Sequence, residues 1–156
     1  MRIERELAAF LSSPVLQIIG THDAAGRPDI GRGHGAAVDA AAGRIDVLFS
    51  RWLWPGTAAN LSANGTMALT FARARDYAAY QIKGTAVLID AGDLHLRVSH
   101  DYDAGIREAL MAQGVASPLI DTWLTDRDPV VARVTVTEIF EQTPGPRAGR
   151  ALAAAP

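Results

Sequence analysis

Residues 46–84 decide the fold, and they read DVLFSRWLWPGTAANLSANGTMALTFARARDYAAYQIKG. The stretch predicts a strand at 46–50, a short helix at 57–63, and strands at 67–71 and 77–84. The helix begins just after the first strand ends, so Ser50, Arg51 and Thr57 gather beside a helix N-terminus. Free N–H groups and the helix dipole favour an anion there. A small phosphorylated ligand is therefore expected at this junction.

The remainder of the chain predicts a small antiparallel barrel with helices around it. A short amphipathic helix precedes the first strand, and turns rich in Gly, Asp and Ala then connect consecutive strands as hairpins. Acidic Asp101 and Asp103 are expected to open a helix that ends near Gly114, and Ser117 begins another. We expect about six strands, at 15–21, 29–38, 45–50, 67–71, 77–89 and 130–141.

Length and composition favour one domain, residues 1–143, followed by a flexible tail of Pro, Gly, Arg and Ala at residues 144–156. The net charge of −2 and the pI near 6.0 give no broad positive field for nucleic acid or an anionic membrane surface. No apolar run is long enough to span a bilayer, and the charged N-terminus does not resemble a secretory signal. We therefore expect a cytoplasmic protein. The absence of cysteine excludes disulfides and thiol catalysis.

The order of these elements, with several short motifs, resembles the FMN-binding split barrel of the pyridoxamine 5′-phosphate oxidase-like superfamily. The matching pieces cover residues 5–90 and the last strand by position. They are Gly26-Arg27-Pro28, Phe49-Ser50-Arg51, residues 57–64, residues 67–71 and residues 81–86. The resemblance implies a mainly β (α+β) fold, a six-stranded antiparallel split β-barrel with short flanking helices. It also implies a homodimer with FMN bound at the subunit interface.

The resemblance also suggests which residues hold the cofactor. The family's phosphate-binding cations include an Arg on the second strand, for which Arg32 is the candidate. They also include an Arg-Lys pair at the start of the short helix, where this chain has Pro55-Gly56-Thr57. Ser50, Arg51, Thr57 and Lys83 would have to compensate. The family's C-terminal Trp/Arg substrate segment is missing as well, so a pyridoxamine phosphate oxidase in the strict sense is not expected.

Each candidate has a plainer alternative. Glycines at 31, 33 and 35 leave one strand face bare for a flat ligand, but the same glycines suit a bulged barrel strand. Ser50, Arg51 and Thr57 suit a phosphate, or a simple helix cap beside a solvated arginine. The side chains of Gln81 and Lys83 project from the same side of their strand. They could face the N1/C2=O edge of a flavin, or simply solvent. The predicted cofactor-binding residues are Arg32, Gly33, His34, Ser50, Arg51, Trp54, Thr57, Gln81 and Lys83.

No catalytic side chain is predicted. His34 is the one histidine suited to proton transfer, and no metal-ligand spacing or Gly-x-Ser-x-Gly elbow is present. Trp52, Trp54 and Trp123 could line a cofactor or pack at an interface. The first hypothesis is an FMN-dependent oxidoreductase acting on a small molecule. The alternative is a non-catalytic split-barrel protein that binds a flavin, a deazaflavin or haem.

Overall fold

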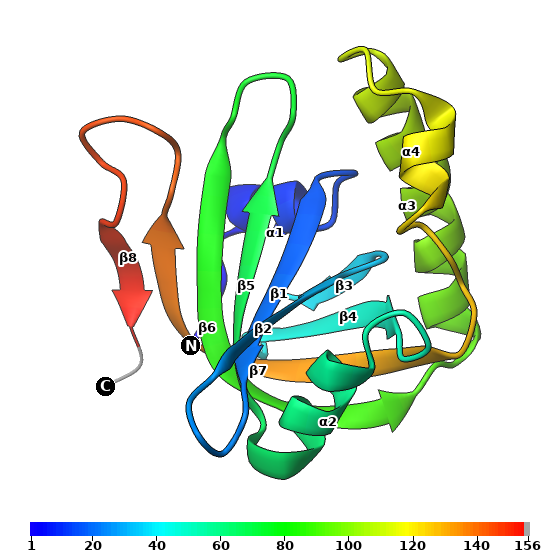
Figure 1. Ribbon diagram of the computed structural model, residues 1–156. Coiled ribbons are helices and arrows are strands. Elements are labelled where there is room, and N and C mark those ends of the chain that lie inside the picture. Colours follow the sequence, from blue (N-terminus) through cyan, green and yellow to red (C-terminus); the bar gives the residue numbers. More distant parts are fainter. Residues whose placement is uncertain (155–156) are drawn as a thin grey trace.

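The computed structural model describes residues 1–154 and shows one coiled antiparallel sheet with helices at its ends and side (Figure 1). The helices are α1 (Arg5–Leu11), α2 (Pro55–Asn64), α3 (Asp93–Met111) and α4 (Ser117–Asp121). The strands are β1 (Leu16–His22), β2 (Pro28–Arg32), β3 (Ala36–Asp39), β4 (Arg44–Ser50), β5 (Thr66–Ala72), β6 (Ala79–Asp90), β7 (Pro129–Glu141) and β8 (Ala151–Ala154). None of these helices is long and apolar enough to cross a membrane.

The sheet has the order β2-β1-β5-β6-β7-β4-β3, with β8 added beside β7, and every pairing is antiparallel. The terminal strands β2 and β3 do not pair with each other, so the barrel is split. The predicted class, an α+β fold with an antiparallel split barrel and short helices, is confirmed. The strand number differs, because the described residues form eight strands instead of six.

One additional strand arises because the predicted strand at 29–38 is broken by a bend at residues 33–35. Gly35 has φ +111°, a conformation that favours glycine, and it interrupts the strand between β2 and β3. The Gln17 side chain accepts a hydrogen bond from the Gly35 N–H at 3.1 Å and fills the inside of the bend. The alternation of glycine with Arg32 and His34 therefore belongs to a bend between two strands.

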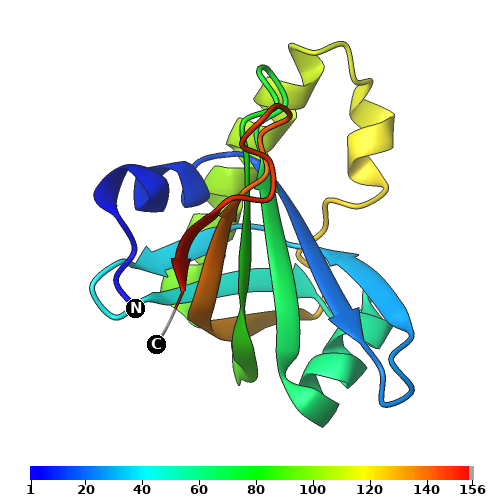
Figure 2. The ribbon, with the colours of Figure 1, turned by 90° about the vertical axis from the view of Figure 1, so that its left-hand side faces the viewer.

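The second additional strand is β8, which lies within the stretch predicted as a flexible tail. Residues after Gln142 form a loop, and Ala151–Ala154 returns antiparallel to β7 (Figure 2). Part of this stretch thus has regular structure. The domain boundary at 143/144 stays a prediction, and residues 155–156 lie outside the described part of the chain.

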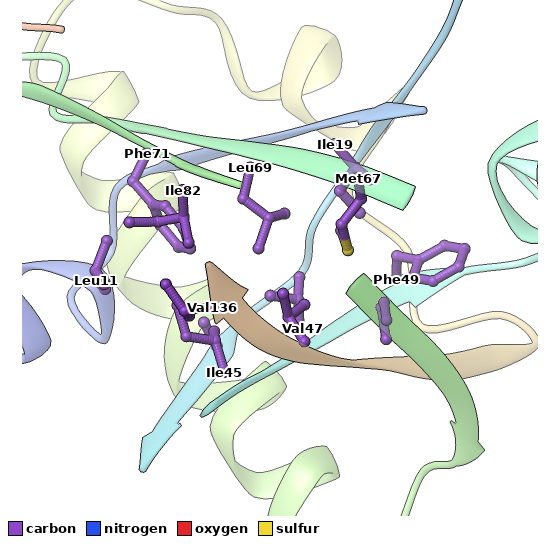
Figure 3. Close-up of a cluster of buried hydrophobic side chains, with 14 of the residues drawn as sticks. Leu11, Ile19, Ile45, Val47, Phe49, Met67, Leu69, Phe71, Ile82 and Val136 are labelled. Atoms are coloured by element: carbon purple, nitrogen blue, oxygen red, sulfur yellow. The ribbon is translucent and has the colours of Figure 1, made fainter. Parts of the chain in front are cut away.

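Branched and aromatic side chains fill the inside of the barrel. Figure 3 shows Leu69, Ile82 and Val136 pointing toward one another from β5, β6 and β7, with Phe49 at one end of the cluster and Leu11 at the other. These five side chains are almost completely buried. Burial of one such side chain contributes about 1.5–3 kcal/mol relative to exposure, so this cluster is the main source of stability.

The segment between β6 and β7 forms a helical insertion, which we define as residues 93–128. Its longest helix, α3, begins at Asp93, eight residues before the predicted start at Asp101. The first turns of α3 contain Leu94, Leu96 and Val98 at a spacing of two residues, which is not a helical period, so the sequence pattern did not indicate this part of the helix. Tyr102, Ile106 and Leu110 of α3 form a second small core with side chains of the following segment. The insertion packs beside β3 and β4 (Figure 1).

A tight turn joins β1 to β2 and sets their register. The Asp23 carboxylate accepts hydrogen bonds from the backbone N–H groups of Ala25 and Arg27 and from the Arg27 side chain. Gly26 has φ +77° and closes the turn. The pairing that follows places Gly20 opposite Ile30 and Thr21 opposite Asp29.

The close approach of β6 and β7 gives a first prediction. A Cβ on Gly84 would collide with the carbonyl oxygen of Thr135 and lie 2.9 Å from Val134 Cγ1, so the backbone would have to move. Gly84→Ala should therefore lower the free energy of unfolding by about 1–3 kcal/mol, measured by urea denaturation.

The matched control is Gly20→Ala. A Cβ at that strand position would lie 3.7 Å from the nearest atom, the Ala68 carbonyl oxygen, which is an ordinary contact. Its free energy of unfolding should stay within about 1 kcal/mol of wild type. Equal effects of the two substitutions would contradict the close approach at Gly84.

Candidate functional site

Three of the predicted site residues, Arg32, Gln81 and Lys83, lie on one face of the sheet. Directly paired residues of antiparallel strands point to the same side, so cross-strand rows identify the side chains that share a surface. We call this surface the outer face. Its first row runs through Arg32, Ile18, Thr70 and Gln81, and its second through Ile30, Gly20, Ala68 and Lys83.

A groove of about 510 Å³ runs over the second row of the outer face. Its floor contains Gly20 and Ala68, whose small side chains leave the backbone accessible. Hydroxyl groups of Thr66 and Thr85 and the amine of Lys83 also line it. The volume lies within the range of small-molecule sites, which combine a mostly apolar lining with a few polar groups.

The two cations of the outer face each lie against an aromatic ring, and Glu138 of β7, which is paired with Lys83, lines the same groove. Arg32 lies 4.5 Å from the Trp123 ring centroid, and Lys83 lies 4.7 Å from the Phe140 ring centroid. Neither forms an ion pair within residues 1–154. Cation–π contacts orient such side chains and leave their positive charge available to an anionic or electron-rich ligand. Lys83 is also the only lysine of the chain.

The predicted phosphate ligands Ser50 and Arg51 lie elsewhere and are engaged within the chain. The Ser50 hydroxyl is buried, donates to the Arg127 carbonyl oxygen at 2.6 Å and accepts from the Leu53 N–H at 3.2 Å. The Arg51 guanidinium donates to both carboxylate oxygens of Asp128 at 3.2 and 3.3 Å. Both residues hold the loop before β7 against the end of β4.

Thr57 binds a carboxylate of the chain itself. Its fully buried hydroxyl donates to Asp29 Oδ2 at 3.0 Å. The same carboxylate lies over Gly56, where a Cβ would be 3.1–3.2 Å from its atoms. A negative charge thus stands at the opening turn of α2, where the sequence predicted a phosphate. The residues at this position do not fit the phosphate group of FMN.

The glycine-rich strand face is likewise occupied by protein atoms. A Cβ on Gly31 would lie 2.5 Å from Thr57 Oγ1 and 3.3 Å from Trp54 Cβ. A Cβ on Gly33 would lie 2.6 Å from Gln17 Oε1. These glycines allow α2 and β1 to pack against the bend, which agrees with the plainer reading of the glycine pattern. Trp54 packs against the main core at the start of α2.

His34 connects the barrel to the helical insertion. It is only 5% exposed, and its Nδ1 donates to the Thr125 carbonyl oxygen at 2.8 Å. Its Nε2 lies 3.7 Å from Asp103 Oδ1, and its ring meets Tyr102 edge to face at 6.0 Å. Burial raises the pKa of the Tyr102 phenol, although nearby Arg32 opposes the shift. The surroundings of His34 are those of a packing residue, and its role in proton transfer stays a prediction.

A second contact that holds the insertion to the barrel was not found from the sequence. The Asp46 carboxylate on β4 accepts hydrogen bonds from Arg133 of β7 at 2.8 and 2.9 Å and from His95 of α3 at 3.0 Å. Burial opposes ionisation of this carboxyl, but these hydrogen bonds outweigh it and hold the pKa of Asp46 below its ordinary value of 3.8. These residues are far apart in the sequence, and no local pattern links them.

No group of three or more His, Asp or Glu side chains that could hold a metal ion occurs in residues 1–154. The polar chemistry of the site therefore comes from the cations and the amide of the outer face. Their arrangement can bind an anionic or electron-rich planar ligand.

Residues 3–143 match the family described as pyridoxamine 5′-phosphate oxidase. The chain belongs to this family, which confirms the resemblance inferred from the sequence. No curated protein matches the chain.

Several solved structures share the fold. HupZ from Group A Streptococcus is 20% identical, with a TM-score of 0.55 over 94% of this chain and 99% of that one. An F420 reductase is 16% identical, with a TM-score of 0.57 over 84% and 93% of the two chains. HutZ, the haem storage protein from Vibrio cholerae, is 19% identical, with a TM-score of 0.54 over 90% and 95%. At these identities the likeness shows the fold alone.

The Asp46 cluster gives a prediction about pH. A carboxyl whose pKa is lowered by folding stabilises the protein above its unfolded-state pKa, and this contribution is lost as the pH falls through the lowered value. Asp46→Asn should lower the free energy of unfolding by about 1.5–3 kcal/mol at pH 7. The difference from wild type should shrink as the pH falls below 3.8.

Urea denaturation at pH 7, 5, 3.5 and 2 measures this dependence. The control is Asp39→Asn, which removes an exposed ion pair with Arg44 and should cost less than about 1 kcal/mol at pH 7. A deficit of Asp46→Asn that stays constant from pH 7 down to pH 2 would show that the charge of Asp46 does not hold the insertion to the barrel.

Proposed function

We propose that the protein is a homodimeric, flavin-dependent oxidoreductase of the pyridoxamine 5′-phosphate oxidase-like type that acts on a small molecule. The observation that supports this most is the outer face, where Arg32 and Gln81 share one cross-strand row and Lys83 lines the adjacent groove with Gly20 and Ala68 on its floor. A cytoplasmic location is part of the same proposal. No catalytic side chain is assigned, because a flavin supplies the redox chemistry when it is bound.

The polar groups of the outer face suit the electron-rich edge of a flavin ring. Gln81 and Lys83 are two residues apart on β6 and project from the same side of the strand. They can donate hydrogen bonds where negative charge increases on reduction, which stabilises the reduced form. Gly20 and Ala68 allow a flat ring system to lie close to the sheet.

FMN is the flavin that the sequence predicts, and its phosphate needs a position other than the opening turn of α2. Arg32 is one available cation, three strands away from Gln81 and so roughly 14 Å across the sheet. A deazaflavin is a related possibility, since an F420 reductase shares the fold.

A homodimer would complete the outer face. Ile30 and Val87 project from β2 and β6 with 63% and 60% of their surface exposed. Neither residue lines the groove, but large exposed apolar side chains on the outer side of the sheet favour an interaction surface. A second copy of the chain placed over this face would cover these side chains and enclose the groove.

The dimer is tested by comparing two equally exposed apolar residues. Ile30→Arg on the outer face should shift the protein from dimer to monomer in analytical ultracentrifugation, because a charge would then be buried at the interface. Leu119→Arg, at a residue 62% exposed on α4, should leave the dimer intact. Dimerisation that survives Ile30→Arg, or a wild-type monomer, would refute this placement of the interface.

The second candidate is a non-catalytic haem-binding protein. The observation in its favour is the carboxylate at the opening turn of α2, which leaves no place there for a flavin phosphate. HutZ, a haem storage protein, has the same fold. An absorbance spectrum separates the candidates: flavin bands support the oxidoreductase, whereas a Soret band after haem addition to colourless protein supports the alternative.

The role of Lys83 is tested by Lys83→Met, which keeps the length of the side chain and removes its charge. Loss of a charge-assisted hydrogen bond should weaken flavin binding by about 1.5–3 kcal/mol, measured by fluorescence quenching of the ligand. The control is Arg97→Met, which removes a positive charge on the exposed side of α3 and should leave the flavin affinity unchanged. In addition, bound flavin should protect Lys83, the chain's only lysine, from an amine-reactive reagent. Unchanged affinity together with absent protection would remove Lys83 from the site.

A further inference from the structure

We infer that Asp29 is a built-in anion at the opening turn of α2, and that it selects against the 5′-phosphate of FMN. A flavin on the outer face can bring its phosphate to this turn only round the free edge of β2, the terminal strand of the sheet. Asp29 opposes that position, so a flavin of the riboflavin class, which lacks the phosphate, should bind at least as tightly as FMN. This inference rests on the proposed flavin-binding function and specifies the form of the ligand. It makes Asp29 a specificity-determining residue.

The first support is the position of the Asp29 side chain. Asp29 is paired with Thr21 of β1, and Thr21 accepts a hydrogen bond from Asn60 of α2 at 3.1 Å. This side of β2 therefore faces α2, opposite to the outer face. The Asp29 carboxylate is held by the buried Thr57 hydroxyl at 3.0 Å and lies directly over Gly56.

The second support is that α2 provides no negative charge of its own. Its N-cap residue Trp54 makes no side-chain cap, and its first turn contains no acidic residue. The N-terminus of a helix attracts negative charge through its free N–H groups and its dipole. Asp29 supplies that charge from a neighbouring strand, and Gly56 leaves the space for it.

The third support is that Asp29 forms no ion pair with any cation of residues 1–154, so a second anion there would add to an unbalanced charge. A phosphate at this turn would meet the Asp29 carboxylate at close range, and like charges at such a distance repel. Arg51, which the sequence suggested as a phosphate ligand, is held by Asp128. Pro55 and Gly56 begin the helix without any positive side chain.

The test uses Asp29→Asn, which keeps the shape of the side chain and an oxygen that can accept from Thr57. Only the charge is removed. Asp101→Asn, on the exposed surface of α3, is the matched control. If Asp29→Asn does not fold, Asp29→Ser replaces it, because serine also removes the charge and retains a polar atom.

The first measurement needs no flavin. Thermal melts are recorded in inorganic phosphate and in sodium chloride of equal ionic strength. A ligand that binds only the folded state raises the melting temperature, so phosphate should raise that of Asp29→Asn by about 2 °C or more beyond its effect on wild type. Wild type and Asp101→Asn should respond alike. Equal responses of all three proteins would overturn the inference.

The second measurement compares flavins by fluorescence titration of the cofactor-free protein. Wild type should bind riboflavin at least as tightly as FMN. Asp29→Asn should gain about tenfold in FMN affinity while its riboflavin affinity stays constant. Wild type that prefers FMN tenfold, with the ratio unchanged in Asp29→Asn, would overturn the inference.

The two measurements separate the inference from the proposed function. If no flavin binds to any variant, the proposed flavin function fails. The thermal melts in phosphate still decide whether Asp29 prevents an anion from binding at the opening turn of α2. If riboflavin binds and phosphate does not distinguish the variants, the function stands and the role of Asp29 is rejected.

Discussion

The fold depends on the pairing of β6 with β7, the two longest strands. They occupy the middle of the sheet order, so β6 joins the β2-β1-β5 half and β7 joins the β4-β3 half. The pairing continues from Tyr80–Glu141 to Asp90–Val130, with a shift of register between Lys83 and Gly84. Strands of this length coil, and a bulge increases the local twist. The absence of a side chain at Gly84 allows the backbones to cross closely at that point.

The strand β2 presents different side chains to the groove on one side and to α2 on the other. Ile30 and Arg32 face the open groove side, whereas Asp29 and Gly31 face α2. This follows from the two-residue period of a strand, which sends neighbouring side chains to opposite sides of the sheet. The candidate ligands named from the sequence therefore fall into two groups. Arg32, Gln81 and Lys83 share the outer face, while Ser50 and Thr57 are buried and hydrogen-bonded to other parts of the chain.

Most of the architecture could be predicted from the sequence because it rests on local patterns. Alternation and apolar runs identified six strand regions, and hairpin turns indicated antiparallel order. The break at Gly35 was missed because a positive φ leaves no trace in an apolar pattern. The start of α3 at Asp93 was missed because its apolar residues there, Leu94, Leu96 and Val98, alternate as in a strand, and its core contacts begin near Tyr102.

The candidate site was harder to predict because it depends on which face each side chain takes. Gln81 and Lys83 were placed correctly on one side, since the strand period decides that. Thr57 was suggested as a phosphate ligand from its place at a helix start, but its partner Asp29 lies 28 residues away. The Asp46–Arg133–His95 cluster spans three elements, so only tertiary structure brings its charges together.

The turn at Asp23–Arg27 has a consequence for how such a protein can diversify. Its hydrogen bonds fix which residues of β2 stand opposite β1. A slip of one residue would exchange the two sides of β2 and carry the carboxylate of Asp29 into the groove, with Ile30 driven against the helix. Any change at this hairpin that shifts the register by one residue would therefore invert the chemistry of the groove, whereas a shift of two residues would keep each side chain on its side of the sheet.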